Sequence, residues 1–79
     1  MSDSEDLAAC VRRALNDYFR QLDGESPQKV WDMVMECVEQ PMLEVVMQQA
    51  RGNQTVAAKV LGISRNTLHK KLVQYGLDA

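Results

Sequence analysis

The chain has 79 residues, of which 46% are apolar and 25% charged, so we expect one small folded domain over residues 1–79. Four Gly, two Pro and 5% aromatic residues leave little material for β-hairpins and favour an all-α fold. A domain of this size buries only about 60% of its unfolded surface, and dimerisation is the usual remedy. No segment approaches the roughly 20 apolar residues of a membrane span. The acidic start lacks a signal-peptide pattern, so we expect a cytoplasmic protein.

The residues that could carry chemistry are scattered. Cys10, Cys37 and the single histidine, His69, lie far apart and lack metal-ligand spacing. Without an export signal, we expect both cysteines to be reduced packing residues. The sequence has no glycine-rich phosphate loop, no carboxylate pair in a recognisable motif and no nucleophile with a base nearby. We therefore expect no metal, cofactor or small-molecule substrate, and no enzymatic activity.

Charge is divided unevenly along the chain. Residues 1–50 hold four basic and ten acidic residues, a net charge of −6, whereas residues 51–79 hold five basic residues and one acidic residue, a net charge of +4. A basic C-terminal third suggests contact with a polyanion. The alternative at this point is ordinary charge scatter on a solvated surface.

The first predicted helix covers about residues 5–22, after a disordered start at 1–6. Its apolar residues recur at steps of three and four: Leu7, Val11, Leu15, Tyr18, Phe19 and Leu22. Ser2 or Ser4 can cap its N-terminus, and Gly24 supplies the left-handed conformation that ends it.

The second predicted helix begins with Ser26 as a cap and Pro27 at the first helical position. Its apolar residues cover a wide arc that one small partner helix cannot cover: Val30, Trp31, Val34, Met35, Cys37 and Val38. Pro41 disfavours helical geometry and removes a donor, so we expect a stop or kink there. A third helix over 41–50 then ends at Gly52.

Residues 51–79 have the order that a helix-turn-helix requires: a short helix, a tight turn and a second helix. Asn53 or Thr55 can cap the first helix, and the small Ala57 and Ala58 allow another helix to cross closely. Gly62 permits a turn with positive φ, and Ser64 caps the second helix.

The second helix of this pair has two faces. Leu68, Leu72 and Tyr75 share the side that should pack on the domain. Arg65 lies in the first turn, where an arginine can donate two hydrogen bonds to the O6 and N7 of guanine. Phosphate oxygens suit the side chains of Asn53, Thr55, Thr67 and Lys70, together with helix N-termini. These features predict DNA binding.

Across residues 7–79 the sequence resembles the Fis family of bacterial DNA-binding proteins. The resemblance rests on the segments Ala14-Leu15-Asn16-Asp17-Tyr18-Phe19, Val38-Glu39-Gln40-Pro41-Met42-Leu43, Arg51-Gly52-Asn53-Gln54-Thr55, Gly62-Ile63-Ser64-Arg65-Asn66-Thr67-Leu68, Lys70-Lys71-Leu72 and Tyr75-Gly76. The C-terminal part is also similar to the DNA-binding ends of enhancer-binding activators of the nitrogen-regulator type. The N-terminal half, with Val-Glu-Gln-Pro, favours Fis.

The Fis resemblance implies a four-helix subunit whose two N-terminal helices, within 7–50, intertwine in a homodimer. It implies DNA bending, with preference set largely by groove width and deformability, and a nucleoid-associated transcription regulator for which RNA polymerase is a further candidate partner. The implied dimer residues are Leu15, Phe19, Val30, Trp31, Val34 and Val38. The implied DNA-binding residues are Arg51, Asn53, Thr55, Ser64, Arg65, Asn66, Thr67, His69, Lys70 and Lys71.

Within that set, Arg65 inherits the base-contacting role and Arg51 a contact to flanking DNA. Ser64 stands where close relatives have Asn, a second base-contacting residue. His69, Val73 and Gln74 replace basic residues, which predicts weaker and less salt-sensitive non-specific binding. Only six residues precede Leu7, so we do not expect the stimulation of DNA invertases for which relatives use an N-terminal arm.

Two other functions fit the same sequence. The chain could be an isolated output domain of an enhancer-binding activator, or a helical dimerisation or adaptor module that binds an acidic protein. Strong salt dependence separates DNA from a protein partner, because counterion release gives log–log slopes of about −0.9 for each phosphate neutralised.

Overall fold

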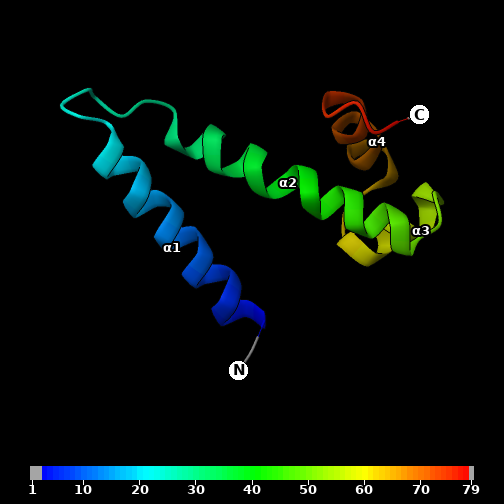
Figure 1. The fold of residues 1–79 in the computed structure, drawn as a ribbon. Coiled ribbons are helices and arrows are strands. Elements are labelled where there is room, and N and C mark those ends of the chain that lie inside the picture. Colours follow the sequence, from blue (N-terminus) through cyan, green and yellow to red (C-terminus); the bar gives the residue numbers. More distant parts are fainter. Residues whose placement is uncertain (1–2, 79) are drawn as a thin grey trace. The chain divides into compact units, whose positions relative to one another are not determined.

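The computed structural model describes residues 3–78 (Figure 1). Within that range it contains four helices and no strand: α1 over Asp3–Gln21, α2 over Val30–Gln49, α3 over Gln54–Leu61 and α4 over Arg65–Gln74. The predicted all-α class is confirmed. The described residues divide into two compact units, the first ending at Val30 and the second beginning at Trp31.

The first unit consists of α1 and the segment that follows it. Residues 3–6 are helical where the sequence suggested a disordered start, and negative charge such as that of Asp6 is favourable near a helix N-terminus. The predicted caps Ser2 and Ser4 lie outside the residues whose side chains are described. After Gln21 the chain turns through Asp23 and Gly24, both with positive φ, so the predicted end of this helix is confirmed to within one residue.

The second helix begins later than predicted. Residues 25–29 are not helical, and α2 starts at Val30. Lys29 has a φ of 54°, which places it in the left-handed region. A right-handed helix cannot pass through a left-handed residue, so the prediction of a cap at Ser26 and a first helical position at Pro27 is wrong.

Pro41 does not end α2, which continues unbroken from Val30 to Gln49. The prediction of a separate third helix over 41–50 is therefore wrong. Proline removes a single backbone hydrogen bond, and here its ring is exposed, so it displaces no packed side chain. Leu43 and Ala50, both buried, hold the following turns against the core.

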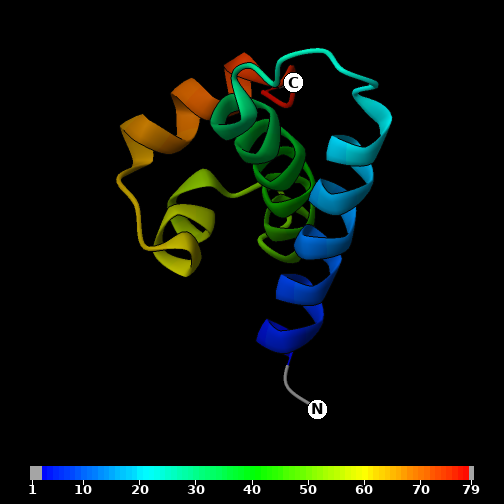
Figure 2. The same ribbon diagram turned by 90° about the vertical axis from the view of Figure 1, so that its left-hand side faces the viewer.

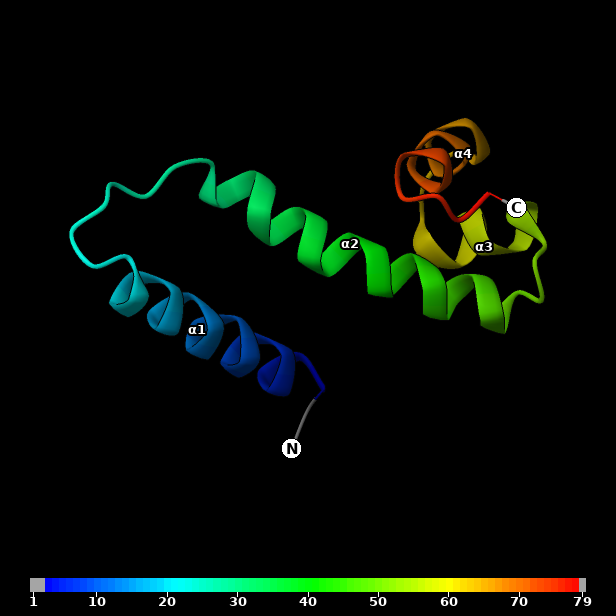
Figure 3. The same ribbon diagram turned by 45° about the horizontal axis from the view of Figure 1, so that its top comes forward.

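The second unit is built around the C-terminal half of α2. Figure 2 shows α3 and α4 on the same side of this helix, with α4 running crosswise to it. Its core contains small residues from α3 and leucines from α4, and consists of Leu43, Ala50, Ala57, Ala58, Leu68 and Leu72. In Figure 3 the red segment leads away from the end of α4. At this end the Leu77 N–H donates to the Leu72 carbonyl at 2.7 Å.

Both cysteines are free, but both are exposed rather than packed. Cys37 lies nearly opposite the core-facing side of α2, and Cys10 lies off the apolar stripe of α1. In the part of the chain that the structure describes, no helix has the length and apolar character needed to cross a membrane. The same residues contain no group of three or more His, Cys, Asp or Glu side chains placed to hold a metal ion.

Candidate nucleic-acid interface

The turn before α3 is set by backbone conformation and one side chain. Arg51 and Gly52 both have positive φ, and the Gly52 N–H donates to the Met47 carbonyl at 3.0 Å, which closes the end of α2. Asn53 then caps α3, because its Oδ1 accepts from the Val56 N–H at 3.2 Å. Of the two predicted caps, Asn53 is confirmed, and Thr55 lies in the first turn of the helix.

Gly62 makes the turn between α3 and α4. Its φ is 78°, and its N–H donates to the carbonyls of Ala58 and Lys59 at 2.9 and 3.2 Å. A left-handed residue at this point is favourable only for glycine. Ile63 then packs against the core, and the chain enters α4 in a new direction.

The first turn of α4 is capped by Ser64, as predicted. Its Oγ accepts from the Thr67 N–H at 3.1 Å and donates to the Thr67 Oγ1 at 2.9 Å. The first N–H groups of a helix lack intrahelical partners. The cap uses the N–H of Thr67, which leaves those of Arg65 and Asn66 at the positive end of the helix dipole.

The two faces of α4 differ sharply. Leu68 and Leu72 are fully buried, which confirms their predicted packing on the domain. The opposite side carries Asn66, Lys70 and Val73, flanked by Thr67, His69 and Gln74, and all six are exposed. Arg65, in the first turn, is exposed as well. These exposed residues provide the cations Arg65 and Lys70 together with several hydrogen-bonding side chains, a composition suited to phosphate oxygens and base edges.

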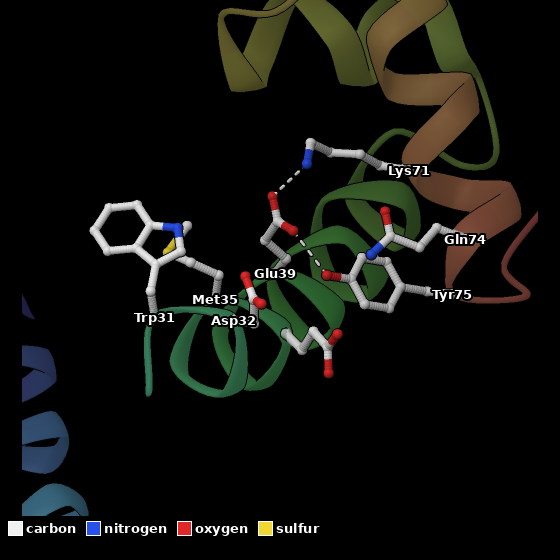
Figure 4. Close-up of a pocket in the computed structure, with 8 residues that line it drawn as sticks. Trp31, Asp32, Met35, Glu39, Lys71, Gln74 and Tyr75 are labelled. Carbon is white, nitrogen blue, oxygen red and sulfur yellow. Dashed lines mark hydrogen bonds and ion pairs between the residues drawn. The ribbon is translucent and has the colours of Figure 1, made fainter. Parts of the chain in front are cut away.

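Lys71 differs from the neighbouring Lys70. Its Nζ lies 2.6 Å from the Glu39 Oε2, so it is bound to α2 of the same unit. The other carboxylate oxygen, Oε1, accepts a hydrogen bond from the Tyr75 hydroxyl at 2.7 Å (Figure 4). Glu39 therefore joins two side chains that lie four residues apart on α4.

These bonds shift the pKa values of Glu39 and Tyr75. Two hydrogen bonds hold the pKa of Glu39 below its ordinary value: the larger effect comes from the Lys71 ammonium and the smaller from the Tyr75 hydroxyl. The hydrogen bond to Glu39 is the main cause that raises the pKa of Tyr75 to about 12. Both shifts follow from stabilisation of the ionised carboxylate and of the protonated phenol.

An open pocket lies beside this contact (Figure 4). It is lined by side chains of α2 and of the C-terminal end of α4, among them three acids and two aromatic residues: Trp31, Asp32, Met35, Glu36, Glu39, Lys71, Gln74 and Tyr75. Trp31 is 76% exposed at one end of it. The pocket is more acidic than basic, which distinguishes it from the exposed face of α4.

The structure places all ten predicted DNA-binding residues in the second unit. Nine of them are exposed, and Lys71 is the half-buried exception. Their roles in DNA binding remain predictions. None of the six predicted dimer residues is buried within its own unit: Leu15, Phe19, Val30, Trp31, Val34 and Val38.

Sequence reasoning did not single out Glu39. The available signal was its position four residues before Leu43, on the same side of α2 as Leu43 and Ala50. An acidic residue on an otherwise apolar face needs a partner. Lys71 and Tyr75, spaced four apart, were suitable candidates.

Comparison with known proteins agrees with this geometry. The model of the family described as bacterial regulatory protein, Fis family, matches residues 34–75, from α2 to the end of α4. A relative in Ralstonia nicotianae, named "Putative Fis-like DNA-binding protein", is 56% identical over 71 residues, which cover 90% of this chain and 92% of the relative. One of the same name in Neisseria meningitidis is 50% identical over 72 residues, or 91% of each chain. The predicted resemblance is thus confirmed, and the chain belongs to the Fis family of bacterial regulatory proteins.

Proposed function

We propose that this protein binds double-stranded DNA through the helix-turn-helix formed by α3 and α4. The observation that carries the proposal is the two-sided character of α4: Leu68 and Leu72 are buried, whereas Lys70 on the opposite side and Arg65 in the first turn are exposed. The names of both relatives describe DNA binding. In this proposal α4 is the recognition helix and enters the major groove with its N-terminal turn.

The contacts divide by chemistry. Arg65 reads guanine through two hydrogen bonds. Lys70 and Thr67 bind phosphates, together with Asn53 and Thr55 at the start of α3. The further contacts of the proposal come from Arg51, Asn66, His69 and the N–H groups that remain at the start of α4.

We also propose that the protein acts as a homodimer, and the two apolar sides of α2 support this. At 100° per residue, Leu43 and Ala50 lie on the core side, whereas Val34, Val38 and Val45 form a second apolar stripe. Within the second unit this stripe is not buried: Val45 is 54% exposed. A helix that is apolar on two sides needs a second partner surface, and another copy of the chain supplies one.

A dimer holds two recognition helices at a fixed separation. We propose that their separation is shorter than one turn of straight DNA, as the family resemblance implies, so that the bound duplex bends. Preference for a site then comes in part from minor-groove width and deformability. Such a protein acts as a nucleoid-associated regulator of transcription.

A gel-shift titration with circularly permuted duplexes at two salt concentrations tests the proposal. We expect binding that weakens with salt and complexes whose mobility depends on the position of the site. Binding without position-dependent mobility would favour the isolated output domain of an enhancer-binding activator. No shift at low salt would overturn DNA binding and leave a helical interaction module with an acidic protein partner.

A further inference from the structure

We propose that Glu39 is a positioning residue for the recognition helix α4 and that it withdraws Lys71 from the cations that contact DNA. The inference rests on the proposed function, which assigns α4 to the major groove. Its structural basis is the double contact of one carboxylate, with Oε1 bound to the Tyr75 hydroxyl and Oε2 to the Lys71 ammonium.

The two neighbouring lysines of α4 are in different environments. The Lys71 side chain is 33% exposed and its partner Glu39 only 15%. An ion pair largely removed from water is less screened by salt than a surface pair and is held more strongly. Lys70 is exposed and has no ion pair among residues 3–78. A phosphate can therefore bind Lys70 directly, whereas Lys71 must first leave Glu39.

The same contact controls how α4 sits on α2. Glu39 lies one helical turn before Leu43, so it extends the interface beyond the apolar core. Lys71 and Tyr75 are four residues apart and lie on one side of α4. Charge-assisted hydrogen bonds at both residues constrain the direction of the helix more narrowly than apolar contacts do. In the proposed dimer, α2 also carries the subunit interface, so Glu39 relates each recognition helix to the dimer axis.

Salt dependence distinguishes a phosphate contact from a positioning contact. Each phosphate neutralised contributes about 0.9 to the slope of log K against log salt. Lys70→Met should therefore reduce the magnitude of the slope by about 0.9 for each bound subunit. Lys71→Met should leave the slope unchanged, although both variants remove one positive charge and keep an unbranched side chain.

The experiment measures these slopes on a preferred duplex and on a random duplex of equal length. We expect Lys71→Met and Glu39→Gln to reduce the ratio of the two affinities several-fold, because α4 is held less firmly. Lys71→Arg, which keeps the charge, should retain the ratio. Lys70→Met, the matched control, should weaken binding to both duplexes about equally.

A second measurement requires no DNA. Thermal unfolding of Glu39→Gln, Lys71→Met and the double variant forms a double-mutant cycle. We expect the Tm loss of the double variant to be clearly smaller than the sum of the single losses. Additive losses would show that the two side chains do not interact and would overturn the inference.

Other outcomes are equally decisive. A slope reduced as much by Lys71→Met as by Lys70→Met would make Lys71 a phosphate contact and overturn its withdrawal. An unchanged affinity ratio in folded Glu39→Gln would overturn the positioning role. A wild-type protein that binds no DNA would overturn the proposed function and the DNA-directed part of the inference, and the unfolding cycle would then decide separately whether Glu39 holds α4.

Discussion

Ser64 and Thr67 exchange two hydrogen bonds in the first turn of α4: the Thr67 N–H donates to the Ser64 Oγ, and the Ser64 hydroxyl donates to the Thr67 Oγ1. With its Oγ1 accepting from Ser64, Thr67 can still direct its own hydroxyl hydrogen outward. Ser64 thus begins the recognition helix and orients a candidate phosphate contact. The role of cap and the role of DNA contact can be separated by substitution.

Ser64→Ala should lower the free energy of unfolding by about 1 kcal/mol, because alanine cannot cap the helix. Ser64→Asn should cost much less, since asparagine is an equally good N-cap. Urea denaturation of the two variants and the wild type measures the difference. Equal losses in both variants would contradict the capping role. Because Ser64→Asn keeps the cap, any gain in its site preference reports a new base contact.

Arg65→Ala should weaken binding to a preferred site by roughly 1–3 kcal/mol per subunit and relax sequence preference. The side chain lies at the first position of α4 and is exposed, so its loss removes a donor pair without removing packing. Competition titrations with single-base variants of the site measure the preference. Unchanged discrimination among these duplexes would show that Arg65 does not read a base.

Leu72→Ala should reduce the free energy of unfolding by about 2–5 kcal/mol, because the side chain is fully buried in the core that α4 shares with α2 and α3. Val73→Ala is the matched control on the same helix. Val73 is 51% exposed, and its truncation should change stability by no more than about 0.5 kcal/mol. Similar losses at both positions in chemical denaturation would contradict the two-sided character of α4.

Acid should remove the contribution of Glu39 to stability. Its pKa is lowered in the folded chain, so the contribution is complete above the ordinary value of 4.5 and is lost as pH falls through the lower folded value. The wild type should therefore lose stability below about pH 4.5 more steeply than Glu39→Gln. Parallel unfolding curves measured as a function of pH would contradict the effect of Lys71 and Tyr75 on this carboxylate.

Tyr75 should lose its contribution to stability at alkaline pH, whereas Glu39 loses its contribution at acid pH. Its pKa rises from 10.0 to about 12 in the folded chain, so its contribution is present below pH 10 and is lost as pH rises toward 12. Lys71 and Glu36 also face this region. Tyr75→Phe removes the hydroxyl alone and should flatten the alkaline limb of the stability curve. An alkaline limb unchanged by this substitution would show that the phenol is not linked to folding.

The parts of the fold that follow local rules were predictable from the sequence. Asn53, Gly62 and Ser64 form their capping and turn hydrogen bonds with residues only a few positions away in the sequence. The spacing of Leu68 and Leu72 identified the buried face of α4. The start of α2 depends on the left-handed backbone at Lys29, for which no local pattern is specific. The contact of Glu39 with Lys71 joins residues far apart in sequence. The local pattern around Lys71 therefore indicated only another cation of the DNA-binding face.

Pro41 shows why a local rule can fail. Its missing N–H costs one hydrogen bond, and the rule for residues before proline disfavours a helix. Against this, Leu43 and Ala50 gain burial only if the helix continues past the proline. Tertiary packing thus outweighs the local preference of proline against a helix. As a result, α2 continues past Pro41, with a core face after that residue and a long apolar stripe on its other side.

The wild-type protein should sediment at micromolar concentration with about twice the chain mass of 8.9 kDa. Trp31, on the second apolar side of α2, is 76% exposed in a single chain, so its truncation should cost about 2 kcal/mol or more of dimer stability if it is an interface anchor. Val60→Ala is the control, because Val60 is 66% exposed on α3, away from that helix side. Trp31 is the only tryptophan, so its emission should shift to the red as the protein dissociates on dilution. A wild-type monomer whose emission is independent of concentration would overturn the dimer and require another partner for this side of α2.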